Sequence, residues 1–396
     1  MDLRISPHLL ATDPPALTAL MARARELAAE GELVNLAQAV VDFPPPGEFI
    51  DEVRRAAGDP AVHRYTPDPG LPELRELLAK YIGERYGMDV DPHDGLLVTP
   101  GANQACFSAL AALLVPGDEV LVPSPWYFNH AMTVQLLGGV VRALPTAPEQ
   151  GHVPDLGAMA EALSARTKAV VLVNPNNPTG SRYPDDWVRE LGDLLRGREI
   201  WVVADQTYQE LVYEGQRPCS IGSLPGMTGR TVTAGSFSKS LSLAGWRAGF
   251  LAGPPALVEQ VLKIHDSSVI SAAHVTQRGL MAALPAVDRH LEDVLPRLRR
   301  RRDALTASLR GFPAIRAARP GGSVFVLAHL PAGIDDAAFS VRLLEEQRVA
   351  AVPAGGMGPG GQSALRLSFA ATGAESLAEA GRRIGQLADS WDGEGG

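Results

Sequence analysis

The sequence has few cysteines and no long apolar run, and each absence excludes a class of protein. Cys106 and Cys219 are the only cysteines among 396 residues, so a disulfide framework is excluded and a reducing cytoplasm is the expected compartment. No apolar run is long enough to span a bilayer. The first residues, MDLRISPHLLATDPP, lack a basic region followed by a long apolar core, which predicts no signal peptide.

The sequence also lacks an excess of positive charge and lacks metal-binding motifs. Its 36 basic and 45 acidic residues give a net charge of −9, which argues against nucleic acid as the main partner. None of the nine histidines lies in an H-E-x-x-H motif, and no C-x-x-C motif is present, so we predict no metal site. A hydrophobic content of 45% with 20% charged residues is typical of a soluble globular enzyme.

The chain is too long for one ordinary core, and its pattern predicts two domains of unequal size. We expect residues 1–48 to form an arm and part of the smaller domain, 49–285 the large domain, and 286–396 a smaller α+β domain. In the large domain, nearly continuous apolar runs alternate with helical segments, which predicts a mostly parallel sheet covered on both faces. The predicted strands are residues 96–99, 120–123, 169–173, 200–204, 231–235 and 248–253.

The arginine run RLRRRR, residues 297–302, lies on a predicted helix at the start of the smaller domain. On a helix these side chains spread around the cylinder. Because the chain is acidic overall, the run predicts a solvated helix and not a nucleic-acid site.

Polar segments follow four of the predicted strands. PGAN (100–103) follows LLVT, NPNNPTG (174–180) follows AVVLV, DQTY (205–208) follows WVVA, and SFSK (236–239) follows TVTAG. In an open parallel sheet, ligands bind beyond the carboxyl ends of the strands. We therefore expect these four segments to meet at one edge of the sheet.

The residue types in these segments suit three parts of one ligand. Gly101-Ala102-Asn103 opens a helix whose free N–H groups favour phosphate, and Ser236 and Arg247 can complete that site. A partly desolvated lysine near a cation, such as Lys239, has a lowered pKa and can attack a carbonyl. A carboxylate such as Asp205 can keep a pyridine nitrogen protonated. Phosphate, pyridine and aldehyde together describe pyridoxal 5′-phosphate (PLP).

The sequence resembles the class I/II, fold-type I PLP-dependent aminotransferases over nearly its whole length, from VNLAQAVVDFPPP to LRLSFA. The resemblance implies an α/β fold with a large domain, whose mostly parallel central sheet is flanked by helices, and a smaller α+β domain. The motifs that carry it stand in the family's order: YTPDPGLPELR, PGAN, PSPWYFNH, NPNNPTG, ADQTY, SFSKSLSLAGWRAGF and LRLSFA.

The resemblance also implies a role for each site residue. Lys239 would form the Schiff base and move the proton, with Asp205 on the pyridinium nitrogen and Tyr208 on the ring oxygen. Arg366 would bind the α-carboxylate of an amino acid substrate. Tyr65 would reach the phosphate of a neighbouring subunit, which implies a homodimer with shared sites. The residues expected to hold the cofactor are Gly101, Ala102, Asn103, Tyr127, Asn177, Asp205, Tyr208, Ser236, Lys239, Arg247 and Tyr65, and those expected beside the substrate are Arg366, Asn177, Ala39 and Gln38.

The sequence departs from the family where two glycines are usual, in the segment Leu36-Ala37-Gln38-Ala39. A methyl group at Ala39 would narrow the space for the substrate, and Gln38 would add a polar group. His274 has two readings, a packed interface histidine or a group that contacts the substrate. Asn129 and His130 have the same two readings.

The same cofactor set serves several reactions, so three functions stay open at this point. The first is transfer of an amino group between an L-amino acid and a 2-oxo acid. The second is a biosynthetic PLP enzyme that catalyses elimination, replacement, decarboxylation or oxidative deamination. The third is a non-catalytic effector-sensing domain, against which the intact Lys239 argues. No second cation for a dicarboxylate substrate can be assigned, so an apolar, aromatic or modified amino acid is equally plausible.

Overall fold

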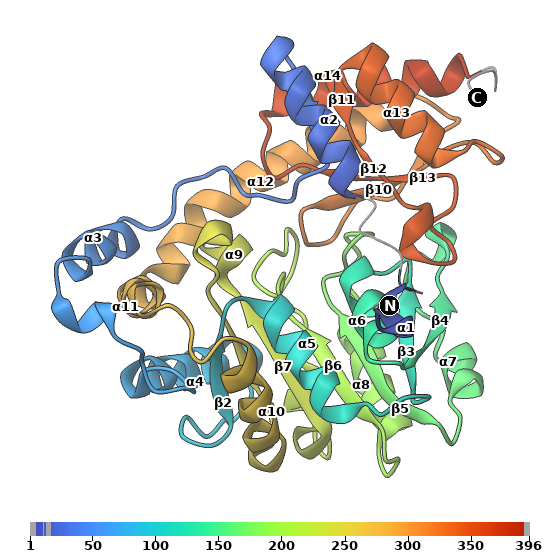
Figure 1. The fold of residues 1–396 in the computed structure, drawn as a ribbon. Coiled ribbons are helices and arrows are strands. Elements are labelled where there is room, and N and C mark those ends of the chain that lie inside the picture. The colour runs from blue at the N-terminus through green and yellow to red at the C-terminus, as the bar shows by residue number, and fades with distance from the viewer. Residues whose placement is uncertain (1–4, 11, 13–16, 392–396) are drawn as a thin grey trace, which may run out of the picture.

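The computed structural model describes residues 5–10, 12 and 17–391, which form two bodies around two sheets (Figure 1). The larger body holds a seven-stranded sheet and the other a four-stranded antiparallel sheet. None of the helices in the described residues combines the length and hydropathy that a bilayer-spanning segment needs.

The seven-stranded sheet confirms the predicted, mostly parallel arrangement. Only β8 runs antiparallel to its neighbours. The order across the sheet is β2 (Leu96–Thr99), β8 (Gly249–Ala252), β7 (Thr231–Ser236), β6 (Trp201–Asp205), β5 (Thr167–Val173), β3 (Glu119–Ser124) and β4 (Val140–Pro145). Sequence patterning did not predict β4, because this edge strand is mostly solvent-facing and lacks a continuous apolar run.

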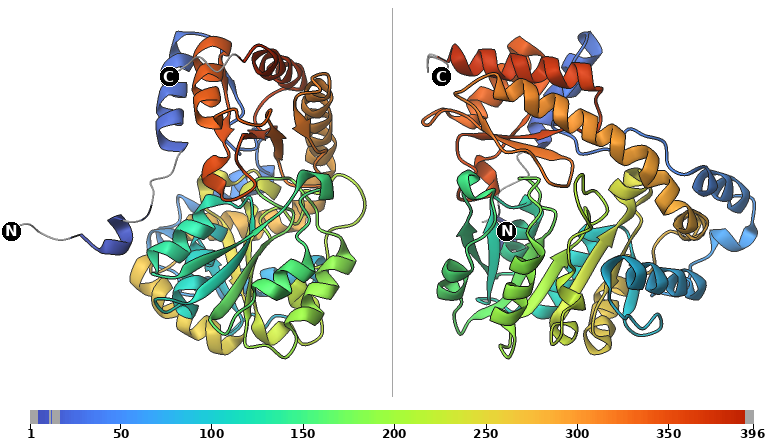
Figure 2. Two further views of the ribbon diagram at one scale, coloured as in Figure 1. Left: turned by 90° about the vertical axis from the view of Figure 1, so that its right-hand side faces the viewer. Right: turned by 180° about the vertical axis from the view of Figure 1, so that it is seen from behind.

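Helices cover both faces of this sheet (Figure 2). On one face α5 (Ala102–Leu113) and α10 (Pro255–Ser268) pack their apolar side chains on the strands. On the other face α8 (Asp185–Leu195) contributes Trp187, Val188 and Leu191 to a second apolar cluster. The strands are buried on both sides, which explains their apolar runs and leaves their ends as the place for polar groups.

The second body combines a sheet with helices, as predicted for the smaller α+β domain. Its sheet has the order β12 (Val352–Pro353), β13 (Ala364–Ser368), β10 (Phe325–His329) and β9 (Arg316–Ala317). The helices beside it are α2 (Leu17–Glu30), α12 (Val287–Arg310), α13 (Asp336–Gln347) and α14 (Ala374–Asp389).

One part of the prediction for α12 was wrong, since its arginine run is not fully solvated. The side chain of Arg302 is completely buried and binds both carboxylate oxygens of Glu214 at 2.7 Å. Its position on the helix turns it toward the core while other arginines of the run stay in solvent, and the ion pair offsets the cost of burying its charge.

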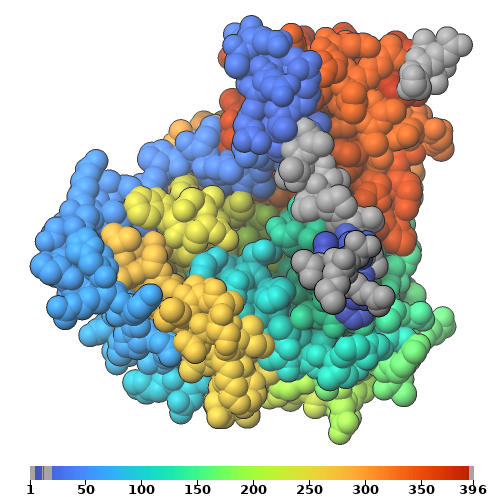
Figure 3. Space-filling model, viewed as in Figure 1, coloured from blue at the N-terminus to red at the C-terminus, as the bar shows by residue number. Residues whose placement is uncertain are grey.

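The remaining segments join the two bodies or project from them. Strand β1 (Val34–Asn35) pairs in parallel with β11 (Val349–Ala350), so the chain just before the Leu36–Ala39 segment is fixed to the second body. Helix α3 lies at one edge of the molecule and packs against α11 (Figure 1, Figure 3). The other helices are α1 (Pro7–Leu10), α3 (Gly47–Ala56), α4 (Pro72–Tyr86), α6 (Phe128–Leu136), α7 (Leu156–Ala162), α9 (Phe237–Ser240) and α11 (His274–Ala283).

Candidate active site

A cavity of about 240 Å³ lies where the carboxyl ends of the parallel strands face the second body. The register pairs Val173 with Asp205 and Asp205 with Ala234, so the ends of β5, β6 and β7 lie level with one another. All but two of the sequence-predicted site residues line this cavity. They are Gln38, Ala39, Ala102, Asn103, Tyr127, Asn177, Asp205, Tyr208, Ser236, Lys239, Arg247 and Arg366.

The two predicted residues outside the cavity lining are Gly101 and Tyr65. Gly101 precedes α5 with a φ of 85°, and a Cβ there would lie 2.9 Å from Nη2 of Arg247. The left-handed backbone favours glycine, and a Cβ would also displace the Arg247 guanidinium. Tyr65 is 78% exposed, so within one chain it contacts none of the cavity.

Hydrogen-bond donors gather at the end of the cavity nearest α5. Helix α5 has no side-chain cap, which leaves its first N–H groups free. Arg247 is held there by the carbonyl oxygens of Pro100 at 3.0 Å and Ala244 at 3.1 Å. Ser236 Oγ accepts from the Ser238 backbone N–H at 3.1 Å, so its own proton remains to donate. This set suits a phosphate.

Lys239 points into the cavity from the short helix α9. Its Nζ donates a hydrogen bond to the carbonyl oxygen of Ala39, on the segment that lacks the usual glycines. Burial, and then the charges of Arg366 and Arg247, lower the pKa of Lys239 to about 8. About one-tenth of this amine is therefore neutral at pH 7 and about half at pH 8, far more than for an ordinary lysine, and only the neutral form is nucleophilic.

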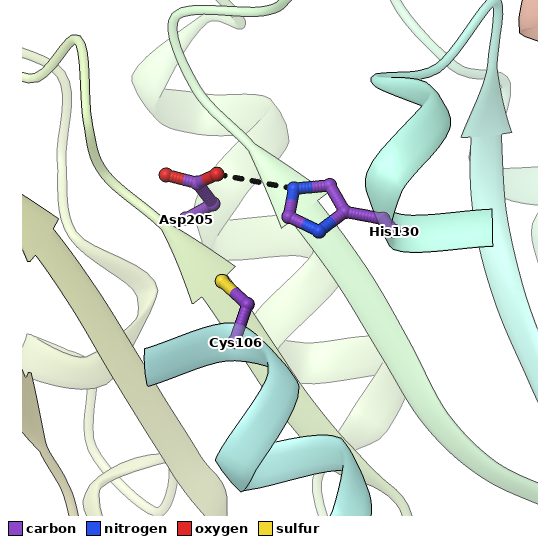
Figure 4. Close-up of side chains that lie close together, drawn as sticks. All are labelled: Cys106, His130 and Asp205. Atoms are coloured by element: carbon purple, nitrogen blue, oxygen red, sulfur yellow. Dashed lines mark hydrogen bonds and ion pairs between the residues drawn. The ribbon is translucent and has the colours of Figure 1, made fainter. Parts of the chain in front are cut away.

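Asp205 ends β6 and is held as a carboxylate by its neighbours (Figure 4). His130 Nε2 lies 3.0 Å from one oxygen, and the backbone N–H and hydroxyl of Thr207 donate to the other at 3.0 and 2.6 Å. Burial acts to raise the pKa of Asp205, but the hydrogen bond and charge of His130 and the bonds from Thr207 outweigh it and lower the pKa. A buried anion at this place suits a protonated ring nitrogen.

Cys106 lies beside this pair, and the ligand atoms of Cys106, His130 and Asp205 are all within 4.8 Å of one another (Figure 4). Sequence motifs could not find this group, because its members come from α5, α6 and the end of β6. Burial, and then the charge of Asp205, raise the pKa of the Cys106 thiol, which favours the protonated form. The His130–Asp205 hydrogen bond accounts for the grouping, and the absence of a metal site stays a prediction.

Two tyrosines, Tyr127 and Tyr208, line the cavity, and Asn129 binds one of them. Burial, then the Asp205 charge, raise the pKa of Tyr208 well above its usual range and that of Tyr127 to about 12, so both phenols are neutral donors. Asn129 donates from Nδ2 to the Tyr127 hydroxyl at 2.7 Å and to Asn103 Oδ1 at 3.1 Å. This contact favours a role for Asn129 in orienting the Tyr127 ring.

Arg366 is a buried cation without an acidic partner. It is 4% exposed, and no carboxylate of the described residues lies within ion-pair distance of it. Nη2 donates to Ala37 O at 3.1 Å, Nη1 lies 3.5 Å from Asn177 Oδ1, and Nε has no hydrogen-bond partner. Burial lowers the pKa of Arg366. Burying a guanidinium with an unbonded nitrogen costs free energy, which a bound anion would offset, so this position suits an anion.

Sequence reasoning missed five residues of the cavity lining, namely Phe128, Thr207, Ser238, Ala244 and Phe325. Phe325 lies on β10 in the second body, and its ring packs 4.7 Å from the guanidinium of Arg366. Nothing in a single apolar strand indicates such a role. His274 lies outside the cavity at the start of α11, with Nδ1 3.4 Å from Arg64 O.

Comparisons of the whole chain agree with this geometry. The model of the family "Aminotransferase class I and II" matches residues 31–384. The chain belongs to this aminotransferase family. The predicted enzyme class, fold-type I architecture and aminotransferase function are thereby confirmed, and members of this family use PLP.

Similar proteins span nearly all of this aminotransferase. The aspartate/prephenate aminotransferase of Thermus thermophilus is 35% identical over 97% of this chain and 98% of its own length. The LL-diaminopimelate aminotransferase of Oleidesulfovibrio alaskensis is 32% identical over 96% of this chain and 98% of its own. A solved structure of an aspartate aminotransferase from Thermus thermophilus with maleate is 34% identical and superposes with a TM-score of 0.91. The match covers 98% of this chain and 100% of that chain.

Proposed function

We propose that the cavity binds PLP and that the enzyme moves an amino group between an L-amino acid and a 2-oxo acid at Lys239. The residues present fit the cofactor at three places. The donors at α5, Ser236 and Arg247 would hold the phosphate, and Asp205 would pair with the ring nitrogen. Tyr208 and Asn177 would contact the ring oxygen, and the Tyr127 ring would lie on one face of the cofactor ring.

The observation that carries the proposal is the buried Arg366, whose fork geometry suits an α-carboxylate. When bound, PLP supplies an aldehyde that joins to amines and a ring that accepts electrons from the breaking bond. Arg366 would orient the substrate so that its Cα–H bond points at Lys239. The Nζ of Lys239 would then take that proton and return it to a different atom, while buried Asp205 keeps its negative charge.

The charges of the cavity also support an amino acid with an uncharged side chain. Its lining includes three cations, Lys239, Arg247 and Arg366, and each has a role above. No further cation of the described residues lines it, so a second carboxylate would find no partner in this chain. Several relatives are named for aspartate, a dicarboxylate, so the proposed uncharged substrate would set this enzyme apart from those relatives.

The proposed reaction is tested by mixing the purified PLP-loaded enzyme with a panel of L-amino acids that includes phenylalanine, leucine and aspartate. Amino transfer predicts the pyridoxamine form of the cofactor and one 2-oxo acid per site, with an uncharged amino acid preferred over aspartate. Release of ammonia or carbon dioxide with return of the aldehyde form would contradict amino transfer. A preference for aspartate would contradict only the proposal that the substrate has an uncharged side chain.

Replacing Arg366 by leucine is expected to raise the KM for the amino acid substrate about 10- to 100-fold, because charge-assisted hydrogen bonds contribute about 1.5–3 kcal/mol. The KM of Arg366→Lys should lie between those of Arg366→Leu and the wild type, since lysine keeps the positive charge but not the forked pair of donors. Arg189→Leu is the control, because Arg189 is a surface residue paired with Asp186. Steady-state kinetics measure each effect, and an unchanged KM in Arg366→Leu would place the carboxylate elsewhere.

The rate at which PLP attaches to the cofactor-free protein is expected to rise with pH, with a midpoint near 8. Lys239 attacks only as the neutral amine, and the environment lowers its pKa to about 8. Stopped-flow absorbance between about pH 6.5 and 9.5 measures this rate, a range chosen to bracket the lowered pKa and approach the ordinary lysine value. Arg366→Leu removes one of the nearby positive charges, so the midpoint should move upward in that variant. A pH-independent rate would exclude control by Lys239.

We further propose a homodimer in which Tyr65 completes the partner's phosphate site. Tyr65 lies in the segment between α3 and α4, and its aromatic side chain is 78% exposed, which supports a covered position in a dimer. Size-exclusion chromatography with light scattering tests the dimer, and a monomer that is fully active would contradict shared sites.

The proposal also includes a cytoplasmic location for the enzyme and the division of the chain into an arm, a large domain and a small domain at residues 1–48, 49–285 and 286–396.

A further inference from the structure

A pair of buried histidines joins the loop after β4 to the four-stranded sheet. His152, in that loop, is 2% exposed, and His329, at the end of β10, is 7% exposed. Their Nε2 atoms are 3.3 Å apart, whereas the ring centroids are 5.3 Å apart and the ring planes differ by 14°. Because the nitrogens are closer than the ring centres, the two rings meet edge to edge through an N–H···N hydrogen bond.

The direction of this hydrogen bond follows from its neighbours. The Thr146 hydroxyl donates its only proton to the carbonyl oxygen of Ser124 at 2.9 Å. Toward His152 Nδ1, 3.1 Å away, it can therefore only accept. Neutral His152 then carries its proton on Nδ1 and accepts at Nε2, so His329 donates from its Nε2.

The charged groups nearby leave this pair neutral. Burial, and then the charge of His329, lower the pKa of His152 to about 4, while Glu149 acts in the opposite direction. Burial, then the charge of Arg316, lower the pKa of His329, again against Glu149. Glu149 and Arg316 form an ion pair across the same interface, but both side chains are more than half exposed, so that pair contributes little.

One face of the four-stranded sheet connects the histidine pair to the active site. Phe325, Leu327 and His329 alternate along β10 and so share a face. Arg366 on β13 stands opposite Leu327 in the antiparallel register, which puts its side chain on that face, between Phe325 and His329. Phe325 and Arg366 both line the cavity. A shift of β10 relative to the seven-stranded sheet would therefore move the guanidinium of Arg366.

We propose that the His152–His329 hydrogen bond is a clamp that positions β10 and β13 against the seven-stranded sheet, and so places Arg366 for the substrate carboxylate. Both histidines are positioning residues, because neither lines the cavity. The clamp rests on the proposed function, since it acts through the carboxylate site at Arg366.

The test compares three variants of the PLP-loaded enzyme. His329→Leu removes the donor and should raise the KM for the amino acid about 3- to 10-fold, the range of one net hydrogen bond, while kcat changes by less than about twofold. In His329→Gln the amide nitrogen can replace the histidine Nε2 as donor, so KM should return to within about twofold of wild type. Arg316→Gln is the control, since it removes the exposed ion pair at the same interface but leaves both histidines in place. Burial, the larger cause of the lowered His329 pKa, is unchanged in this variant, so neither constant should change.

A wild-type KM in His329→Leu would overturn the clamp and leave the proposed function intact. Failure of the wild-type enzyme to transaminate any amino acid would instead contradict the proposed function. If His329→Leu does not fold, His329→Asn is compared with His329→Gln. The shorter side chain of asparagine does not reach His152. A KM that is raised in His329→Asn but not in His329→Gln therefore supports the clamp, and equal KM values in the two variants overturn it.

Discussion

Replacing Lys239 by alanine is expected to lower kcat by at least ~10²–10⁴-fold, the range that a positioned general base typically contributes. The reason is that Nζ is the one amine of the described residues in the cavity lining, that its pKa is lowered to about 8, and that it lies where Arg366 would direct the Cα–H bond. The cradle of α5, Ser236 and Arg247 remains in this variant. PLP should therefore still bind, though without a covalent bond to the chain.

Two measurements separate these expectations. Borohydride treatment of the wild-type enzyme, followed by digestion and mass spectrometry, should add the reduced cofactor to the peptide that contains Lys239, and Lys239→Ala should show no such adduct. Lys263→Ala is the matched control, because Lys263 lies on the surface of α10 and donates only to Gln260. An adduct at another lysine, or nearly full activity in Lys239→Ala, would refute the assignment.

Replacing Asp205 by asparagine should reduce kcat on the order of 10²–10³-fold, as when one preorganised electrostatic partner is removed from an active site. The substitution keeps the shape and the bonds to Thr207 but removes the one carboxylate that lines the cavity within the described part of the chain. Without that anion, the ring nitrogen of the cofactor would lose the partner that keeps it protonated.

The absorption spectrum of the loaded protein and its dissociation constant for PLP measure this effect separately from turnover. Both should change in Asp205→Asn, with weaker PLP binding. Asp193→Asn is the control, since Asp193 is exposed and pairs only with Arg196. His130→Gln should have a smaller effect in the same direction, because His130 lowers the pKa of Asp205. Unaltered turnover in Asp205→Asn would show that the ring nitrogen has no need of this carboxylate.

Local patterns in the sequence predicted most of the large sheet and most of the residues that line the cavity. Apolar runs mark the buried strands, and Asp205 and Ser236 stand at the ends of β6 and β7, where parallel packing brings them together. The same logic failed for β4, whose residues are mostly exposed at the sheet edge. It also failed for Arg302, because the direction in which one helix face points depends on its neighbours.

The sequence by itself determined that this chain carries an amine, a carboxylate and a set of hydrogen-bond donors at strand ends, because those signals are local and their spacing is fixed by the sheet. Only the tertiary structure decided that Arg366 is buried without an acid, that His130 holds Asp205, and that His152 meets His329. Each of these contacts joins residues far apart in the chain. Their energies depend on burial and distance, which no local pattern encodes.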